Sequence, residues 1–163
     1  MKRSICLIMV LCFMLSGCSV VGERIKEPVA FYYVSDTYQE DMAQVIVSEV
    51  REASGHRDDL SYLLALYSRG PITEELKTPL PRNSNITVVD HSENSLELNL
   101  TDGSPEMTDA NFTLASACIA KTCMELTDVQ QITVHSGDRR ITIQHDNLLL
   151  DHSMSQNTQE ETT

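Results

Sequence analysis

The sequence predicts an α+β domain, a sandwich in which helices pack on one face of a mainly antiparallel sheet. Three observations predict it: segments in which apolar and polar residues alternate, segments with apolar residues at helical spacing, and polar turns between them. The expected order of elements is β-α-α-β-β-α-β-β. Helices that interleave with hairpins favour a sheet covered on one side by helices.

The first three elements are predicted from composition and spacing. Residues 31–34 (Phe-Tyr-Tyr-Val) form a β-rich run closed by polar residues, which predicts a strand. Residues 40–53 carry apolar side chains at helical spacing and two acids in the first turn, which predicts a helix. A second helix is expected to open at Asp58 and Asp59 and to end before Pro71, because proline cannot continue the hydrogen-bond ladder.

The second half of the chain predicts two hairpins around one helix. Residues 86–90 and 96–100 alternate in polarity and are separated by a polar Ser-Glu-Asn turn, which predicts a hairpin with one buried face. Residues 107–126 return to helical spacing. Residues 131–135 and 140–145 alternate again around a glycine turn, and we expect them to close the domain as a second hairpin.

The N-terminus has the features of a bacterial lipoprotein signal. Lys2 and Arg3 precede an apolar run over residues 5–15, which is shorter than the roughly 20 residues of a transmembrane helix. Residues 15–18 (Leu-Ser-Gly-Cys) then resemble a lipobox, in which small residues admit the peptidase and the sulfur of Cys18 takes a diacylglyceryl group. We therefore expect lipid attachment at Cys18. Two acyl chains on this residue would anchor the protein stably in the membrane. The alternative is an ordinary secretory signal with a chance cysteine.

These features divide the chain into four parts. We expect a signal peptide over residues 1–17, the lipidated cysteine and a tether over 18–29, a folded domain over 30–152 and a disordered polar tail over 153–163. Removal of the signal takes away two basic residues and no acid, so the net charge changes from −12 to −14. An excess of 24 Asp and Glu over 12 Lys and Arg argues against nucleic acid as a partner, because phosphate contacts need basic residues.

The cysteines and histidines do not predict a metal site. Cys118 and Cys123 would have Cα atoms about 8–9 Å apart on a helix, beyond the roughly 7 Å limit for a disulfide. Cys123 falls on the core face and Cys118 on its flank, with a disulfide or a reactive role as the alternatives. His135 and His145 would meet across the last hairpin near Asp138, but zinc usually takes three or four protein ligands.

Motifs of catalysis are not found either. The sequence has no G-x-S-x-G and no Gly-rich phosphate loop, and 24 acids always offer a chance carboxylate pair. We therefore expect no catalytic residues, no cofactor and no enzyme activity. Tyr32 and Tyr33 should lie on opposite faces of their strand. An exposed tyrosine there would anchor a partner, and the alternative, which is the more frequent role, is that the ring caps the edge of the core.

A series of short motifs runs through the expected domain in a fixed order. Residues 63–71 read Leu-Leu-Ala-Leu-Tyr-Ser-Arg-Gly-Pro, residues 79–81 read Pro-Leu-Pro before the first hairpin, and residues 119–124 end a helix before a valine-containing strand. Over residues 29–143 this series resembles the GerMN domain of sporulation and spore-germination proteins, whose signature is "LL…GP". One departure is Cys123, where the family usually has leucine.

The resemblance implies a function. It implies a membrane-anchored interaction module on the extracytoplasmic face of the cell membrane in a Gram-positive type of envelope, with a role in sporulation or germination assembly. The partners implied are the membrane, through the lipid anchor, and an envelope protein or a second copy of the chain. The alternative hypothesis is a lipoprotein that binds a small ligand or a cation. A third, an envelope hydrolase, would need a cleft that holds an acid or nucleophile with a perturbed pKa.

Overall fold

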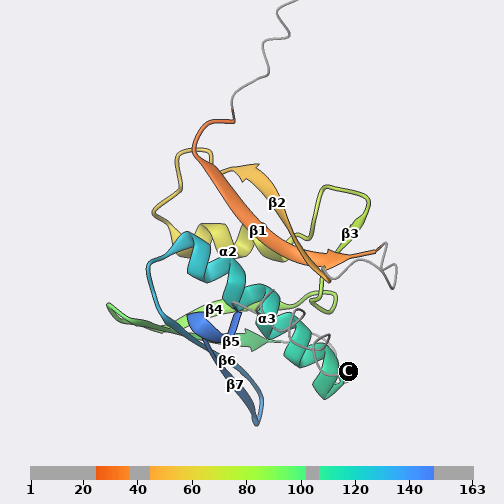
Figure 1. Ribbon diagram of the computed structural model, residues 1–163, viewed down its shortest axis with the longest axis vertical. Helices are drawn as coiled ribbons and strands as arrows, with labels where there is room; N and C mark the ends of the chain where they lie inside the picture. Colours follow the sequence, from red (N-terminus) through yellow and green to blue (C-terminus); the bar gives the residue numbers. More distant parts are fainter. Residues whose placement is uncertain (1–24, 37–44, 102–106, 149–163) are drawn as a thin grey trace, which may run out of the picture.

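The structure, a computed structural model, describes residues 25–36, 45–101 and 107–148. Figure 1 shows three layers: a three-stranded sheet, a middle layer of two helices, and a four-stranded sheet. In chain order the elements are β1 (Pro28–Ser35), β2 (Ile46–Glu52), α2 (Leu60–Ser68), β3 (Leu76–Lys77), β4 (Asn85–His91), β5 (Ser95–Thr101), α3 (Asp109–Leu126), β6 (Gln131–Ser136), β7 (Arg139–Gln144) and α4 (His145–Leu148). The predicted α+β class is confirmed.

One segment predicted as helix is a strand. Residues 46–52, inside the helix expected over 40–53, form β2 and pair antiparallel with β1 from Pro28↔Glu52 to Val34↔Ile46. The reason is that Ile and Val are β-branched residues, which fit a pleated strand better than a helix. Residues 40–44 of the expected helix lie outside the described residues. The element order therefore begins β-β-α rather than β-α-α.

The boundaries of the domain differ slightly from those expected. Strand β1 begins at Pro28, within the predicted tether over 18–29, because Val29 is buried and pairs with Arg51 of β2. The short strand β3 lies in the segment after α2, where the expected element order has no strand, and pairs with the end of β1. The predicted signal over 1–17 and the tail over 153–163 lie outside the described residues.

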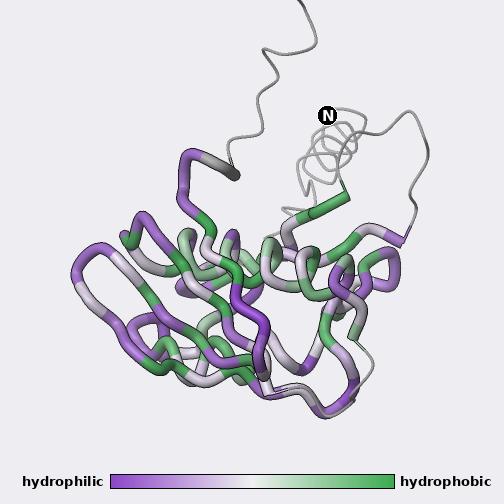
Figure 2. The backbone as a smooth tube through the Cα atoms, turned by 90° about the horizontal axis from the view of Figure 1, so that it is seen from below, coloured by the Kyte–Doolittle hydropathy of each residue, from purple (hydrophilic) through white to green (hydrophobic). Residues whose placement is uncertain are grey.

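The expected single sheet is divided into two. The first has the strand order β2-β1-β3, and the second has the order β4-β5-β6-β7. All pairings are antiparallel except that of β5 with β6, which are parallel and connected through α3. A parallel pair needs such a crossover, because its strands must start at the same edge of the sheet. In Figure 2 the outer loops are mostly hydrophilic, and hydrophobic stretches run through the helices and strands.

The core lies between the two sheets and contains the facing sides of both helices. Helix α3 packs against β1, β6 and β7, and α2 packs against β4. The rings of Tyr33 on β1 and Tyr67 on α2 stack with centroids 4.9 Å apart. The largest fully buried side chains come from both sheets and both helices: Tyr33, Tyr67, Phe31, Leu63, Leu64, Leu96, Leu98, Leu100, Ile119, Ile132, Val134 and Thr122.

The helices also close one edge of β1. Strand β3 pairs only with Val34 and Ser35, and no other strand in the described part of the chain pairs with β1 on that side. The backbone N–H of Tyr32 instead donates to Oγ1 of Thr122 on α3 at 2.9 Å, and Oη of Tyr67 on α2 donates to the carbonyl of Tyr32 at 3.1 Å. Side chains of the middle layer thus take the place of a neighbouring strand.

Candidate functional site

The predicted lipidation site lies outside the described residues. Cys18 belongs to the segment before residue 25, so lipid attachment stays a prediction from the sequence. Within the described ranges, none of the helices has the length and apolar character needed to cross a membrane.

The two remaining cysteines are buried in helix α3. Cys118 and Cys123 are both free thiols with no exposed surface. Burial raises the pKa of each thiol to about 12, although Lys121 lowers the pKa of Cys118 in part. Cys118 was expected on the flank of the helix; it is buried because α3 lies between two sheets and contacts both. The thiols stay protonated at neutral pH, and a protonated, buried thiol is a poor nucleophile and metal ligand.

The histidines that were considered for a metal site are not brought together. His135 pairs with Arg140 across the last hairpin, whereas His145 follows the strand at its other end. His135 lies on the outer face of the four-stranded sheet, where its Nε2 is 2.5 Å from Oε1 of Glu97. Asp138 is exposed in the turn. Among the residues described, no group of three or more His, Cys, Asp or Glu is placed to hold a metal ion.

A buried ion pair lies where the three-stranded sheet meets the end of α2. Nε of Arg51 donates to Oε1 of Glu49 at 2.6 Å, and both side chains are 7% exposed. The guanidinium also donates to the carbonyls of Leu66 and Gly70 at the end of the helix. It lies 5.4 Å from the ring centroid of Phe31. A cation is favourable at the C-terminus of a helix, so Arg51 caps α2 from the neighbouring sheet.

Glu49 binds the segment that follows the helix. Its carboxylate accepts hydrogen bonds from the backbone N–H groups of Ile72 and Thr73 at 2.9 and 2.7 Å. Burial raises the pKa of Glu49, but the hydrogen bonds from Thr73, Arg51 and Ile72 outweigh it and hold the pKa below the ordinary value of 4.5. Gly70 has φ +86°, a left-handed conformation that glycine adopts without strain. The Gly-Pro end of the "LL…GP" motif is therefore the backbone turn that this ion pair holds.

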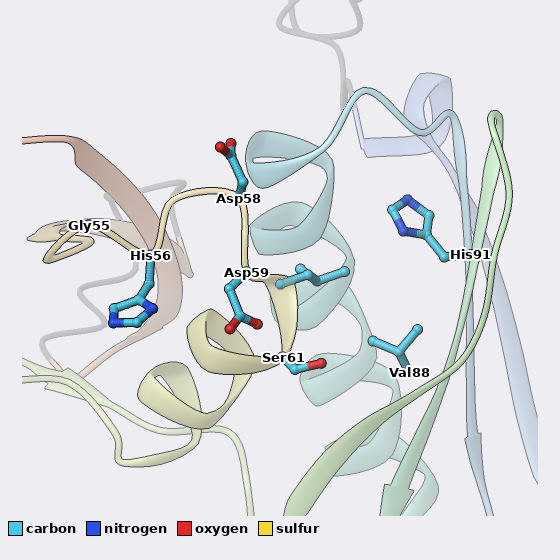
Figure 3. A pocket seen from close by; sticks show the side chains of 8 residues that line it. Gly55, His56, Asp58, Asp59, Ser61, Val88 and His91 are labelled. Atoms are coloured by element: carbon cyan, nitrogen blue, oxygen red, sulfur yellow. The ribbon is translucent and has the colours of Figure 1, made fainter.

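A cavity lies at the other end of α2 (Figure 3). It has a volume of about 490 Å³ and is formed by the loop before α2, the first turn of that helix and strand β4. Its lining residues are Gly55, His56, Asp58, Asp59, Leu60, Ser61, Val88 and His91. Figure 3 shows His56 and His91 on opposite sides, with Asp58 and Asp59 directed away from each other.

Two of the polar residues in this cavity have structural roles. Oδ1 of Asp59 accepts a hydrogen bond from the N–H of Tyr62 at 3.0 Å and caps helix α2. The ring of His56 stacks on Tyr62 with centroids 4.1 Å apart. The lining residues therefore do not converge on one point, as a nucleophile with its base would.

A second cavity of about 380 Å³ adjoins the first and shares Asp58, Leu60 and His91 with it. Its remaining residues come from the loop before α2, helix α2, the β4–β5 turn, the end of α3 and the segment that follows it: Arg57, Leu63, Ser92, Glu93, Leu126, Thr127, Asp128 and Val129. We call the two cavities together the end groove. It is open to solvent along the end of the molecule where α2 begins, and it is the candidate binding site of this chain.

Solved structures of two proteins are similar to this chain. The chain is similar to GerMN domains. The match is to the tandem GerMN domains of the sporulation protein GerM from Bacillus subtilis, with 16% sequence identity and a TM-score of 0.46, over 76% of this chain and 43% of that one. The chain thus spans less than half of the tandem-domain structure. This is the family that the sequence motifs resemble.

A second similar structure is a protein from Clostridium perfringens that carries the name lipoprotein. Its identity is 12% and its TM-score 0.38, over 74% of this chain and 88% of that one. No protein-family model matches the sequence, and a search of curated proteins finds no match.

Sequence reasoning missed both the ion pair and the end groove. Glu49 and Arg51 are charged residues in a stretch that also contains Ser48 and Glu52, a composition typical of a solvent-facing segment. The signal that could have indicated their burial is that Phe31 and Val29, their partners on β1, are apolar. The groove combines residues from three separate segments of the chain, and no local pattern reveals such a combination.

Proposed function

We propose that this chain is a lipid-anchored module on the extracytoplasmic face of the cell membrane that works by binding an envelope protein. The observation that carries the proposal is the lipobox-like segment at residues 15–18 after a signal-type apolar run. From Cys18 to Pro28, where β1 begins, ten residues reach at most about 33 Å at roughly 3.3 Å per residue. A domain on so short a tether works close to the membrane surface.

The geometry of the end groove supports binding rather than chemistry. Asp59 caps helix α2, and His56 stacks on the ring of Tyr62 in that helix. The polar side chains that line the groove point in several directions. Its base is apolar and its sides are charged, the composition of a recognition surface. The sequence resemblance to GerMN proteins adds sporulation or germination assembly as the process in which the module would act.

The anchor is tested with a cysteine variant and metabolic labelling by a fatty acid. The wild-type protein should incorporate the label and sediment with membranes. Cys18→Ala should lose the label and appear in the medium or as uncleaved precursor. Cys12→Ala, in the same apolar segment, is the matched control and should be labelled like the wild type. A fully processed, membrane-retained Cys18→Ala protein would contradict the proposal.

The partner is tested by cross-linking in living cells. A specific cross-linked species that depends on the anchored form should appear under at least one growth condition. Recovery of the uncross-linked chain under every condition, sporulation included, would argue against an interaction module. Calorimetric titration with Ca²⁺ and Zn²⁺ tests the alternative, because a cation-binding lipoprotein should show saturable heat.

A further inference from the structure

We propose that the end groove binds a basic, aliphatic segment of a membrane-proximal protein. The proposal rests on the proposed function, because it names the chemistry of the partner of the interaction module. The two cavities share Asp58, Leu60 and His91, so an extended segment of several residues can lie across both.

The base of the groove accounts for the aliphatic part of the segment. Leu63 and Val129 are 1% and 3% exposed and form a firm apolar surface beneath the second cavity. Leu60 and Leu126 are half-buried beside them. Part of this apolar surface still faces solvent. When an aliphatic side chain of a partner covers that part, both apolar surfaces are removed from water, which favours binding.

The sides of the groove account for the basic part. Four exposed carboxylates line it, those of Asp58, Asp59, Glu93 and Asp128. Among the described lining residues the one Lys or Arg is Arg57, and its guanidinium donates a hydrogen bond to the carbonyl of Pro28. The groove therefore has an excess of negative charge, which attracts lysine and arginine side chains to either side of the apolar base.

The position of the groove accounts for a partner near the membrane. The segment that leads to the predicted anchor is joined to the loop before α2: the N–H of Gly55 donates to Oε2 of Glu27 at 2.8 Å, and the N–H of Ala53 donates to the carbonyl of Glu27 at 3.1 Å. Glu27 is nine residues after Cys18. The carboxylates repel anionic lipid headgroups, so the segment that we propose belongs to a protein and not to the lipid surface.

The test is a binding measurement with defined probes on the full lipidated chain in neutral detergent. The first probe is a fluorescent Gly-Lys-Leu-Lys-Val-Lys-Gly peptide, and its acidic counterpart has glutamate in place of each lysine. We expect saturable binding of the basic peptide that weakens with added salt, and none of the acidic one. The double variant Glu93→Lys with Asp128→Lys should weaken binding at least tenfold.

A matched variant separates a local site from overall charge. Glu74→Lys with Glu75→Lys makes the same change of net charge in an exposed loop outside the groove, and should change the affinity by less than twofold. Equal loss in both double variants would overturn the proposal, as would the absence of peptide binding. Binding of phosphatidylglycerol vesicles that is abolished by substitution in the groove would assign it to lipid and would also overturn it. Either failure leaves the Cys18 labelling result, and so the proposed anchor, intact.

Discussion

The backbone of Tyr32 shows how single side chains join the layers of this molecule. Its N–H and its carbonyl both point away from β2, and both are satisfied by side chains, Oγ1 of Thr122 and Oη of Tyr67. Thr122 is fully buried, so no water can replace its hydroxyl. An unsatisfied buried donor costs more than the bond itself contributes.

Thr122→Val should therefore destabilise the protein by about 1–3 kcal/mol, because the isosteric side chain leaves the N–H of Tyr32 without an acceptor. Thr122→Ser keeps the hydroxyl and is the control; it should cost less than the valine variant. The measurement is the free energy of unfolding from urea titration. Equal stability of wild type and Thr122→Val would show that the hydrogen bond contributes nothing.

The buried thiols of α3 make a second residue-scale prediction. A form of the protein that begins at Ser19 contains only Cys118 and Cys123. Because burial raises the pKa of both thiols to about 12, neither should react with a chromogenic disulfide reagent at pH 8 in the native state. Both should react within seconds in urea. Fast titration of one thiol in the native protein would place that cysteine at the surface.

At the scale of elements, the end of α2 depends on β2. Arg51 caps the helix and Glu49 holds the chain after Gly70, so one ion pair connects a strand, a helix and a loop. Such a pair contributes little more to the free energy of unfolding than two packed apolar residues would. Removal of one partner, however, leaves the other charge buried and uncompensated.

Glu49→Gln should destabilise the protein at pH 7 by about 3 kcal/mol, the cost of breaking a buried pair. The folded-state pKa of Glu49 is lowered, so its contribution is present above the unfolded value near 4.5 and is lost as the pH falls through the folded pKa. The difference from wild type should therefore shrink as the pH falls below 4.5. Glu52→Gln, exposed on the same strand, is the control, and a pH-independent difference for Glu49→Gln would contradict the prediction.

The sequence predicts elements well where local signals agree. Helices α2 and α3 have apolar residues at helical spacing and polar N-caps, Asp59 and Thr108, and both form near the expected positions. The helix prediction for residues 46–52 was wrong, because their apolar spacing suits a helix while their β-branched side chains and their partner strand favour β structure. The helix α4 was not predicted, since four residues carry too little periodic signal.

At the scale of the whole molecule, Glu27, nine residues after the predicted anchor, lies at the same end of the fold as the candidate site. Glu27 is bonded to the loop before α2, and that loop lines the end groove. The anchor was predictable because a signal is a local sequence feature. The groove was not, because it forms only when α2, the β4–β5 turn and the α3–β6 segment pack together.

The described core begins at Val29 and is formed by both sheets and both helices, so we expect the anchor to be separable from the fold. A protein that begins at Ser19 should leave the membrane fraction while its urea midpoint and its affinity for the basic peptide stay within error of those of the detergent-solubilised lipidated form. Circular dichroism and anisotropy measure this. A lower midpoint would mean that residues before Ser19 stabilise the domain.

The closed edge of β1 also bears on how the chain folds. The hairpin of β1 and β2 is local in sequence, but the hydroxyl that satisfies Tyr32 comes from a residue 90 positions later. Until α3 has emerged and docked, that strand edge is an unpaired template on which another chain can add. A chain truncated before α3 should therefore aggregate through its first hairpin. In the full chain α3 is synthesised after this hairpin, so the edge of β1 stays exposed until α3 docks.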